Sequence, residues 1–214
     1  MRAVTSAPAP PGMWRNPAFQ RLLTATTVST FGSFITRMAL PLVAILMLES
    51  DAFGVALVRS MDLIAGLLVG LVAGAWVDRL RRKPVLVWTD LGRAALLATI
   101  PIAWLANVLS FGQVLLIALA AAALTTFNYA ADHAYLPTVV GRERLIPANS
   151  AITASESVSE FTGFGVSGFL VAALGGPLAI ALDAATFVFS AVVVQTIRTP
   201  EPAPDRTVQR NIRG

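Results

Sequence analysis

The sequence lacks cysteine, contains a single histidine, His133, and carries few charges. Without cysteine there can be no disulfide bond, thiol catalysis or cysteine-ligated metal, and one histidine argues against a histidine-based metal site or triad. Charged residues make up 13% of the 214 residues, about half of the ~25% that soluble domains usually carry. Hydrophobic residues make up 56%, and the mean hydropathy is +0.70. These values favour a membrane protein without metal or cofactor.

Two polar, proline-rich ends flank the apolar body of the chain. Residues 1–17 lack the apolar core of about 7 to 15 residues that defines a signal peptide, and we expect them to form a cytoplasmic tail. Residues 199–214 are polar and basic, and we expect a second cytoplasmic tail there. The region between them, 18–198, is predicted to be the membrane-embedded domain.

Long apolar runs in this body predict six transmembrane helices, because a helix needs about 20 mostly apolar residues to cross a bilayer. No charged residue occurs from Ala94 to Ala131, which is too long for one span, and the polar stretch 107–113 marks a turn within it. The alternating pattern of barrel strands is absent. The predicted fold is therefore an all-α integral membrane bundle. Its helices are expected at about 19–48, 53–77, 84–106, 113–136, 145–174 and 178–197.

The positive charges are distributed asymmetrically. All lysines and arginines except Arg37, Arg59 and Arg93 fall near the two ends of the chain or in the loops after the second and fourth helices. The turns at 49–52, 107–112 and 175–177 contain none. Cytoplasmic loops carry the excess of lysine and arginine, so both termini are predicted to be cytoplasmic. This also explains the net charge of +4 without a nucleic-acid partner, and a basic face of this kind can attract anionic lipids.

The loop between the second and third helices carries a recognisable motif. Residues 74–83 read Gly-Ala-Trp-Val-Asp-Arg-Leu-Arg-Arg-Lys, which resembles the loop signature Gly-x-x-x-Asp-Arg-x-Gly-Arg-Arg/Lys of the major facilitator superfamily. Arg81 stands where that signature has glycine. Further segments resemble the enterobactin-exporter and macrolide-efflux branch, and together they cover residues 15–214. These are Arg15-Asn16-Pro17-x-Phe19, Thr36-Arg37-x-Ala39-Leu40-Pro41, Asp90-x-x-Arg93, Tyr135-Leu136-Pro137, Gly141-Arg142-Glu143-x-Leu145, Ala148-Asn149-Ser150 and Leu182-Asp183-Ala184-x-x-Phe187.

The resemblance implies the N-terminal half of a twelve-helix transporter, built as three helices plus three in inverted orientation. Residues 210–214 resemble the start of the linker to a second half. The implied partner is therefore a second six-helix half, which could be another copy, a separately encoded chain or the missing remainder of the same gene. The implied function is proton-coupled export of small amphipathic molecules, such as drugs or siderophores, across the inner (plasma) membrane. The alternative is a truncated remnant or an accessory subunit that transports nothing.

An enzyme is not expected. The sequence contains no nucleophile–base pair, metal cluster or phosphate-binding loop. The nucleotide-binding motif Gly-x-x-x-x-Gly-Lys is also absent, so ATP is not expected to drive the process.

The loop motif and the helix before it provide the first candidate site, a cytoplasmic gate. Arg79, Arg82 and Lys83 would serve equally well as a positive anchor, but an anchor does not explain Asp78. The resemblance implies that Asp78 caps a helix of the second half. Three residues separate Asp90 from Arg93, and this pair either extends the gate or neutralises itself.

Glycines recur at every fourth position of the second helix, at Gly66, Gly70 and Gly74. Such spacing allows close helix approach. It fits either tight packing inside one bundle or a moving contact with a second half, which the resemblance favours.

Charged residues near the outer ends of the helices form a second candidate site. Arg37, Arg59, Asp62 and Asp183 lie within predicted spans, where charges should pair or face water. The sequence leaves open whether either arginine pairs with Asp62 or Asp183 for structural reasons, or whether the group forms an outer gate or binds substrate.

The fifth helix carries two acidic residues, Glu156 and Glu160, on one face near mid-membrane, and no lysine or arginine follows Arg144 on this helix. We expect both carboxylates to be buried and unpaired, so that they could carry protons. Alternatively, they line a polar cavity with Asn128, Ser155 and Ser159, or serve a structural role. The motif Gly163-Phe164-Gly165-x-x-Gly168 follows. It resembles an antiporter motif, with Phe164 in place of proline.

Asp132 and His133 lie near the inner end of the fourth helix. Arginine is common at the position of Asp132 in sequences of the family that this chain resembles, so the inner-gate charge pattern is expected to differ. His133 is expected at the membrane interface.

Overall fold

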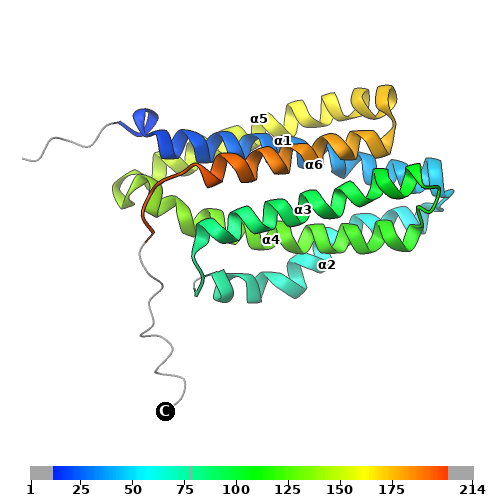
Figure 1. The fold of residues 1–214 in the computed structure, drawn as a ribbon, viewed down its shortest axis with the longest axis horizontal. Coiled ribbons are helices and arrows are strands. Elements are labelled where there is room, and N and C mark those ends of the chain that lie inside the picture. Colours follow the sequence, from blue (N-terminus) through cyan, green and yellow to red (C-terminus); the bar gives the residue numbers. More distant parts are fainter. Residues whose placement is uncertain (1–11, 78, 202–214) are drawn as a thin grey trace, which may run out of the picture.

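Six long helices account for most of the described chain. A computed structural model describes residues 12–77 and 79–201, so that Asp78 and most of both predicted tails lie outside the described residues (Figure 1). The elements are η1 (Met13–Arg15), α1 (Pro17–Leu48), α2 (Ala52–Val77), α3 (Arg82–Leu105), α4 (Phe111–Val140), η2 (Arg142–Arg144), α5 (Leu145–Leu174) and α6 (Gly176–Gln195). All six predicted helices are confirmed, and the described ranges contain no strand.

Local sequence signals set several helix ends. The Asn16 side chain accepts a hydrogen bond from the Ala18 N–H at 3.0 Å, and a proline occupies the first position of α1, an arrangement that satisfies a free helix donor. Ser110 caps α4 in the same way, accepting from the Gln113 N–H at 3.3 Å. Between α5 and α6 the chain turns at Gly175, whose φ of 82° suits glycine.

The end of α4 differs from the prediction. The fourth helix was predicted to end at about residue 136, before Pro137, but α4 continues to Val140. A proline removes only its own N–H bond, and the Gly141 N–H still bonds the Pro137 carbonyl at 3.0 Å. Gly141, with a φ of 79°, then ends the helix.

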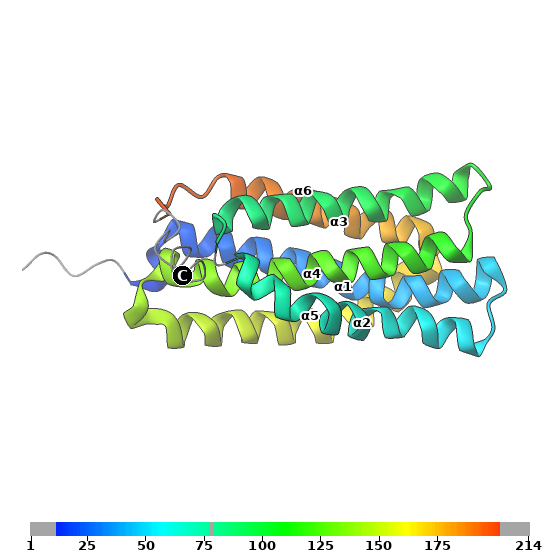
Figure 2. The same cartoon turned by 90° about the horizontal axis from the view of Figure 1, so that it is seen from below.

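The helices form two rows of three. The helices α5, α1 and α6 make one row and α2, α4 and α3 the other (Figure 1). The view from below separates α3 and α6 along one edge from α2 and α5 along the opposite edge (Figure 2). α3 packs extensively against α6, whereas α2 and α5 share no comparable interface among the described residues. The bundle is therefore closed along one edge and open along the other.

The helix contacts follow an inverted repeat. Exchanging α1 with α4, α2 with α5 and α3 with α6 converts the α1–α5 interface into α4–α2 and the α1–α6 interface into α4–α3. The α3–α6 interface maps onto itself. Exchanged helices run in opposite directions along the bundle, as an inverted three-plus-three repeat requires.

All six helices are long and apolar enough to cross a membrane. Large apolar side chains cover the outside of the bundle, including Leu67 on α2, which is 78% exposed, and Phe161 on α5, which is 85% exposed. Apolar surface on this scale requires lipid or another apolar partner. The chain is therefore a multi-pass membrane protein.

Candidate functional site

A cavity of about 400 Å³ lies between the two rows of helices. Residues of α1 and α4, the central helices of the rows, provide most of its lining, and the other four helices contribute side chains. All residues predicted for a proton-coupling or substrate cavity lie along it. These are Arg37, Asp62, Asn128, Glu156, Glu160 and Asp183.

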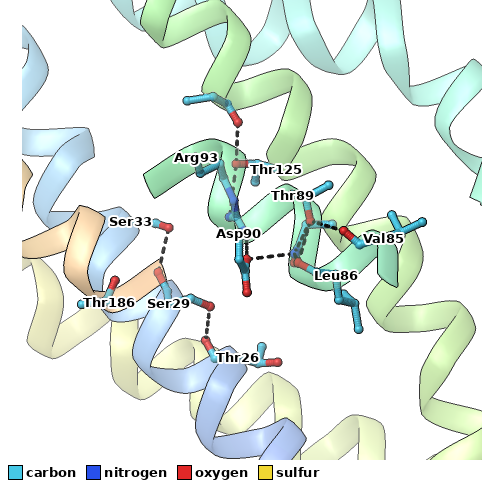
Figure 3. Close-up of polar contacts among 12 residues, drawn as sticks. Thr26, Ser29, Ser33, Val85, Leu86, Thr89, Asp90, Arg93, Thr125 and Thr186 are labelled. Atoms are coloured by element: carbon cyan, nitrogen blue, oxygen red, sulfur yellow. Dashed lines mark hydrogen bonds and ion pairs between the residues drawn. The ribbon is translucent and has the colours of Figure 1, made fainter. Parts of the chain in front are cut away.

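A buried ion pair stands at the wall of this cavity. Arg93 donates to Asp90 one turn earlier on α3, and the two residues are only 4% and 2% exposed. The side chains of Thr89, Asp90 and Arg93 lie close together on α3 (Figure 3). Asn128 of α4 donates to Asp90 Oδ1 at 3.0 Å and to Thr89 Oγ1 at 2.8 Å. The Arg93 Cζ atom also lies 4.0 Å from the centroid of the Phe187 ring. Asp90 and Arg93 thus pair with each other within this half, which agrees with the predicted neutralisation and leaves their role in a gate a prediction.

The outer charges are only partly arranged as expected. Arg37 Nε lies 3.6 Å from Asp62 Oδ2, and both side chains are about half exposed, at 51% and 54%. This ion pair was one of the predicted pairings. Arg59 forms no ion pair with any described residue, although it lines the cavity.

Pairing of Asp183 with Arg37 or Arg59 is wrong. Asp183 is 1% exposed and accepts hydrogen bonds from the hydroxyl of Thr36 and, at 3.0 Å, from that of Thr186. The physical reason is the close approach of α1 and α6: a Cβ placed on Gly32 would collide with Asp183 and Thr186. This approach buries the carboxylate among hydroxyls, out of reach of either arginine.

The acidic residues of α5 lie on the open side of the cavity. Glu156 is half-buried and Glu160 is exposed, so the expectation that both are buried within this half is wrong. α5 stands at the end of its row with α1 as its main neighbour, which leaves one face uncovered. Neither glutamate forms an ion pair within residues 12–77 and 79–201.

Asp132, which was predicted only to alter the charge pattern of the inner gate, is also a cavity residue. It is 9% exposed, lines the cavity, and its Oδ1 atom has no hydrogen-bond partner in the described chain. The signal was present in the helical spacing: Thr125, Asn128 and Asp132 share one face of α4. His133, one residue later, is exposed, and its ring stands edge-on to Tyr129 at 4.3 Å.

The loop motif between α2 and α3 is hydrogen-bonded to the end of α6 in the same half. The Lys83 ammonium donates to the carbonyls of Gln195 and Ile197, and Glu201 Oε1 accepts from the N–H groups of Arg82 and Lys83 at 2.6 and 3.3 Å. Arg79 is exposed in the loop between α2 and α3. The predicted capping role of Asp78 falls on a residue outside the described chain.

The repeated glycines of α2 face away from the bundle. A Cβ on Gly66, Gly70 or Gly74 would meet no atom within 4 Å, so tight packing inside one bundle is not their role. Gly163 of α5 behaves differently, since a Cβ there would lie 2.8 Å from the Phe34 Cβ. The α2 face is thus uncovered in this half.

Comparisons with a family model and with curated proteins indicate the same protein family. The family model of the Major Facilitator Superfamily matches residues 22–213. An uncharacterized MFS-type transporter of Mycobacterium tuberculosis is 33% identical over 167 residues, which are 73% of this chain and 37% of that protein. The multidrug efflux pump Tap of Mycolicibacterium fortuitum is 30% identical over 200 residues, 91% of this chain and 48% of the pump.

A third relative, an uncharacterized MFS-type transporter of Bacillus subtilis, is 25% identical over 191 residues, 89% of this chain and 44% of its own. The chain therefore spans half or less of the length of these curated relatives. No solved structure gives a significant match.

Proposed function

We propose that this chain, which belongs to the major facilitator superfamily, works as one half of a secondary transporter that exports small amphipathic molecules by alternating access. The observation that carries the proposal is a charge-lined cavity inside an otherwise apolar bundle. Ionisable groups in a membrane are costly and mark a solute or ion path by default. Such paths lie at the interface between repeats in secondary transporters, and members of this family are generally not enzymes.

The second half of the machine would cover the open edge of the bundle. This edge carries the uncovered glycine face of α2 and the exposed apolar side chains of α5. The relatives contain about twice the matched length. The partner in this proposal is therefore a six-helix half, supplied by a second copy, by another chain or by the remainder of a longer chain. Rocking of the two halves would expose the cavity to each side of the membrane in turn.

Protons are the coupling ion in this proposal. Glu156 and Glu160 line the cavity with no cation bound to either in the described residues. A carboxyl in such a place can take up a proton on one side and release it on the other. Efflux as the direction is supported by the multidrug efflux pump among the relatives.

Both termini are proposed to be cytoplasmic and the membrane to be the plasma (inner) membrane. The ends of α1 and α6 that lead to the termini lie at the same end of the bundle (Figure 1). That end also holds Arg79, Arg82 and Lys83. The positive-inside rule assigns such an end to the cytoplasm, where the motif would act as the inner gate against the second half.

Everted membrane vesicles energised by a pH gradient provide the test. The panel would contain three fluorescent amphipathic probes: ethidium as a cation, a tetracycline as a zwitterion and carboxyfluorescein as an anion. We expect proton-dependent accumulation of at least one probe in vesicles that contain the chain. The control is vesicles from cells that lack it. If none accumulates, the transport proposal is wrong, and the alternative of an accessory subunit takes its place.

A further inference from the structure

Asp132 has a buried, unsatisfied carboxylate oxygen at the wall of the cavity. The residue is 9% exposed and lines the cavity, and its buried Oδ1 atom has no hydrogen-bond partner in the described chain. Burial of an unpaired charge is unfavourable, as is the removal of one member of a buried ion pair. Buried polar atoms without partners are uncommon and need an explanation. A ligand that brings its own positive charge would provide one.

The charge balance of the cavity lining is negative. Five carboxylates line it, Asp62, Asp132, Glu156, Glu160 and Asp183, against the three guanidinium groups of Arg37, Arg59 and Arg93. Two of these guanidinium groups are already engaged, Arg37 by Asp62 and Arg93 by Asp90. Arg59 is the remaining cation of the lining.

Arg59 lies at the opposite end of the cavity from Asp132. Arg59 lies about 10 Å along α2 from the first residue of that helix, Ala52. Asp132 lies about 12 Å along α4 from the last residue of that helix, Val140. These helix ends are at opposite ends of the bundle, so about 20 Å separate the two residues along its axis. Glu156, which also lines the cavity, lies about 17 Å along α5 from Leu145, at the same end of the bundle as Asp132, and carries the same sign. The inner end of the cavity is therefore a region of negative potential.

The surroundings of Asp132 suit an organic cation better than a metal ion. The described residues contain no group of three or more histidine, aspartate or glutamate side chains that could hold a metal, and metal ions in proteins need about four or more ligands. Tyr129, one turn before Asp132, presents an exposed ring to the cavity. Aromatic faces attract organic cations. A volume of about 400 Å³ is within the range of small-molecule sites, about 300–1,000 Å³.

We propose that the inner end of the cavity is a binding site for amphipathic organic monocations, with Asp132 as the counter-ion of the positive centre. Glu156 adds a second negative charge, and Tyr129 covers the apolar part of the ligand. The inference rests on the proposed transport function and names the substrate class for it. Neutral and anionic amphipathic molecules gain nothing from Asp132 and are disfavoured.

Two probes of matched size and shape but opposite charge test this site: tetraphenylphosphonium and tetraphenylborate. Their binding would be measured by equilibrium dialysis with the full chain in nanodiscs, in the oligomeric state in which it purifies, after subtraction of empty nanodiscs. We expect tetraphenylphosphonium to bind at least about tenfold more tightly than tetraphenylborate. Loss of one charge of a buried pair costs at least 2 kcal/mol, so Asp132→Asn should weaken the cation by more than about tenfold.

Two further variants make the result specific. Asp132→Glu keeps the charge and should retain cation binding, which separates loss of charge from loss of fold. Glu143→Gln removes an exposed carboxylate outside the cavity and should leave both probes unchanged. Equal affinity for the two probes, no binding of either, or full cation affinity in Asp132→Asn would each overturn the proposed site.

Failure of this site can be distinguished from failure of the transport function. Asp132-dependent cation binding without pH-driven flux of any probe would support the site and contradict transport. Flux of zwitterionic or anionic probes that Asp132→Asn leaves unchanged would support transport and overturn the cation site.

Discussion

The Lys83 ammonium group donates a hydrogen bond of 2.7 Å to the backbone carbonyl of Ile197. A second bond, of 2.9 Å, reaches the Gln195 carbonyl at the end of α6. Helix C-termini present carbonyls without intrahelical partners, and a cation there is favourable. The loop motif between α2 and α3 thus has a structural role within its own half, besides any contact with a second half.

Lys83→Met should lower the stability of the bundle. The change leaves the carbonyls of Gln195 and Ile197 without their cation, which should cost about 1 kcal/mol. The measurement is the thermal unfolding midpoint of the purified chain in detergent. Arg81→Met is the matched control, since it removes the same charge from an exposed position of the same loop, and its midpoint should stay near that of the parent. Equal shifts in the two variants would show that loop charge, rather than these bonds, is responsible.

The buried pair of Asp90 and Arg93 should give a non-additive double-mutant cycle. Asp90→Asn and Arg93→Met each leave the partner charge buried and uncompensated, which should cost about 3–5 kcal/mol. The double variant removes both charges and should be no less stable than either single variant. Chemical unfolding in mixed micelles measures all three. Additive losses would mean that the two residues act independently, against the observed contact.

Glycines of α5 should differ in their tolerance of a methyl group. A Cβ on Gly163 would lie 2.8 Å from the Phe34 Cβ, whereas a Cβ on Gly168 meets nothing within 4 Å. Gly163→Ala should therefore destabilise the bundle by about 1–3 kcal/mol through overpacking. Gly168→Ala should be neutral or stabilising, because alanine is favoured over glycine in helices by up to about 1 kcal/mol. The two unfolding midpoints decide the point, and equal effects would contradict the packing assigned to Gly163.

The helices were predictable because hydrophobic length and turn residues determine them locally. The predicted fifth helix, 145–174, coincides with α5, and Gly175 marks its end. The continuation of α4 beyond Pro137 was missed, since one proline near a helix end costs little when the following N–H is still bonded. Hydrophobic length and residue spacing therefore predict the helices and the depth of each residue along the membrane normal.

Sequence spacing does not give the direction in which each side chain points across the bundle. Depth alone suggested that Asp183 meets an arginine, but the approach of α6 to Gly32 turns it toward Thr36 and Thr186. Asp132 was recognisable as a cavity residue from its helical spacing to Asn128. Its unpaired oxygen was not, because that depends on side chains from several helices.

If two copies associate through the open edge of the bundle, the geometry of that edge predicts which residues of the two copies come into contact. A two-fold axis along the membrane normal through the cavity would bring α2 of one copy against α5 of the other. Gly66 lies about 17 Å from the α2 end at Val77, and Ser157 lies about 18 Å from the α5 start at Leu145, at the same end of the bundle. If the chain works as a homodimer, the double variant Gly66→Cys/Ser157→Cys should form disulfide-linked dimers upon oxidation.

The chain has no native cysteine, so any such bond involves the introduced thiols. Ile102→Cys/Ser157→Cys is the control, because Ile102 is exposed on α3 at the opposite edge of the bundle and should give no dimer. Gel electrophoresis without reductant reads the result. Equal cross-linking of both variants, or of neither, would contradict a homodimer through the open edge and favour a separately encoded half.

Proton coupling should depend on Glu160, an exposed carboxylate of the cavity lining without an ion-pair partner among the described residues. Glutamine has nearly the shape of a protonated glutamate but cannot release a proton. Glu160→Gln should therefore permit exchange of substrate down its own gradient while it reduces flux driven by a pH gradient at least tenfold. Proteoliposomes with and without a pH gradient measure the two rates on the same preparation. Glu143→Gln, outside the cavity, should change neither rate. Unchanged pH-driven flux in Glu160→Gln would show that Glu160 is not needed for proton coupling. A parallel loss of both rates would instead assign Glu160 to substrate binding, because only a coupling residue affects the pH-driven rate alone.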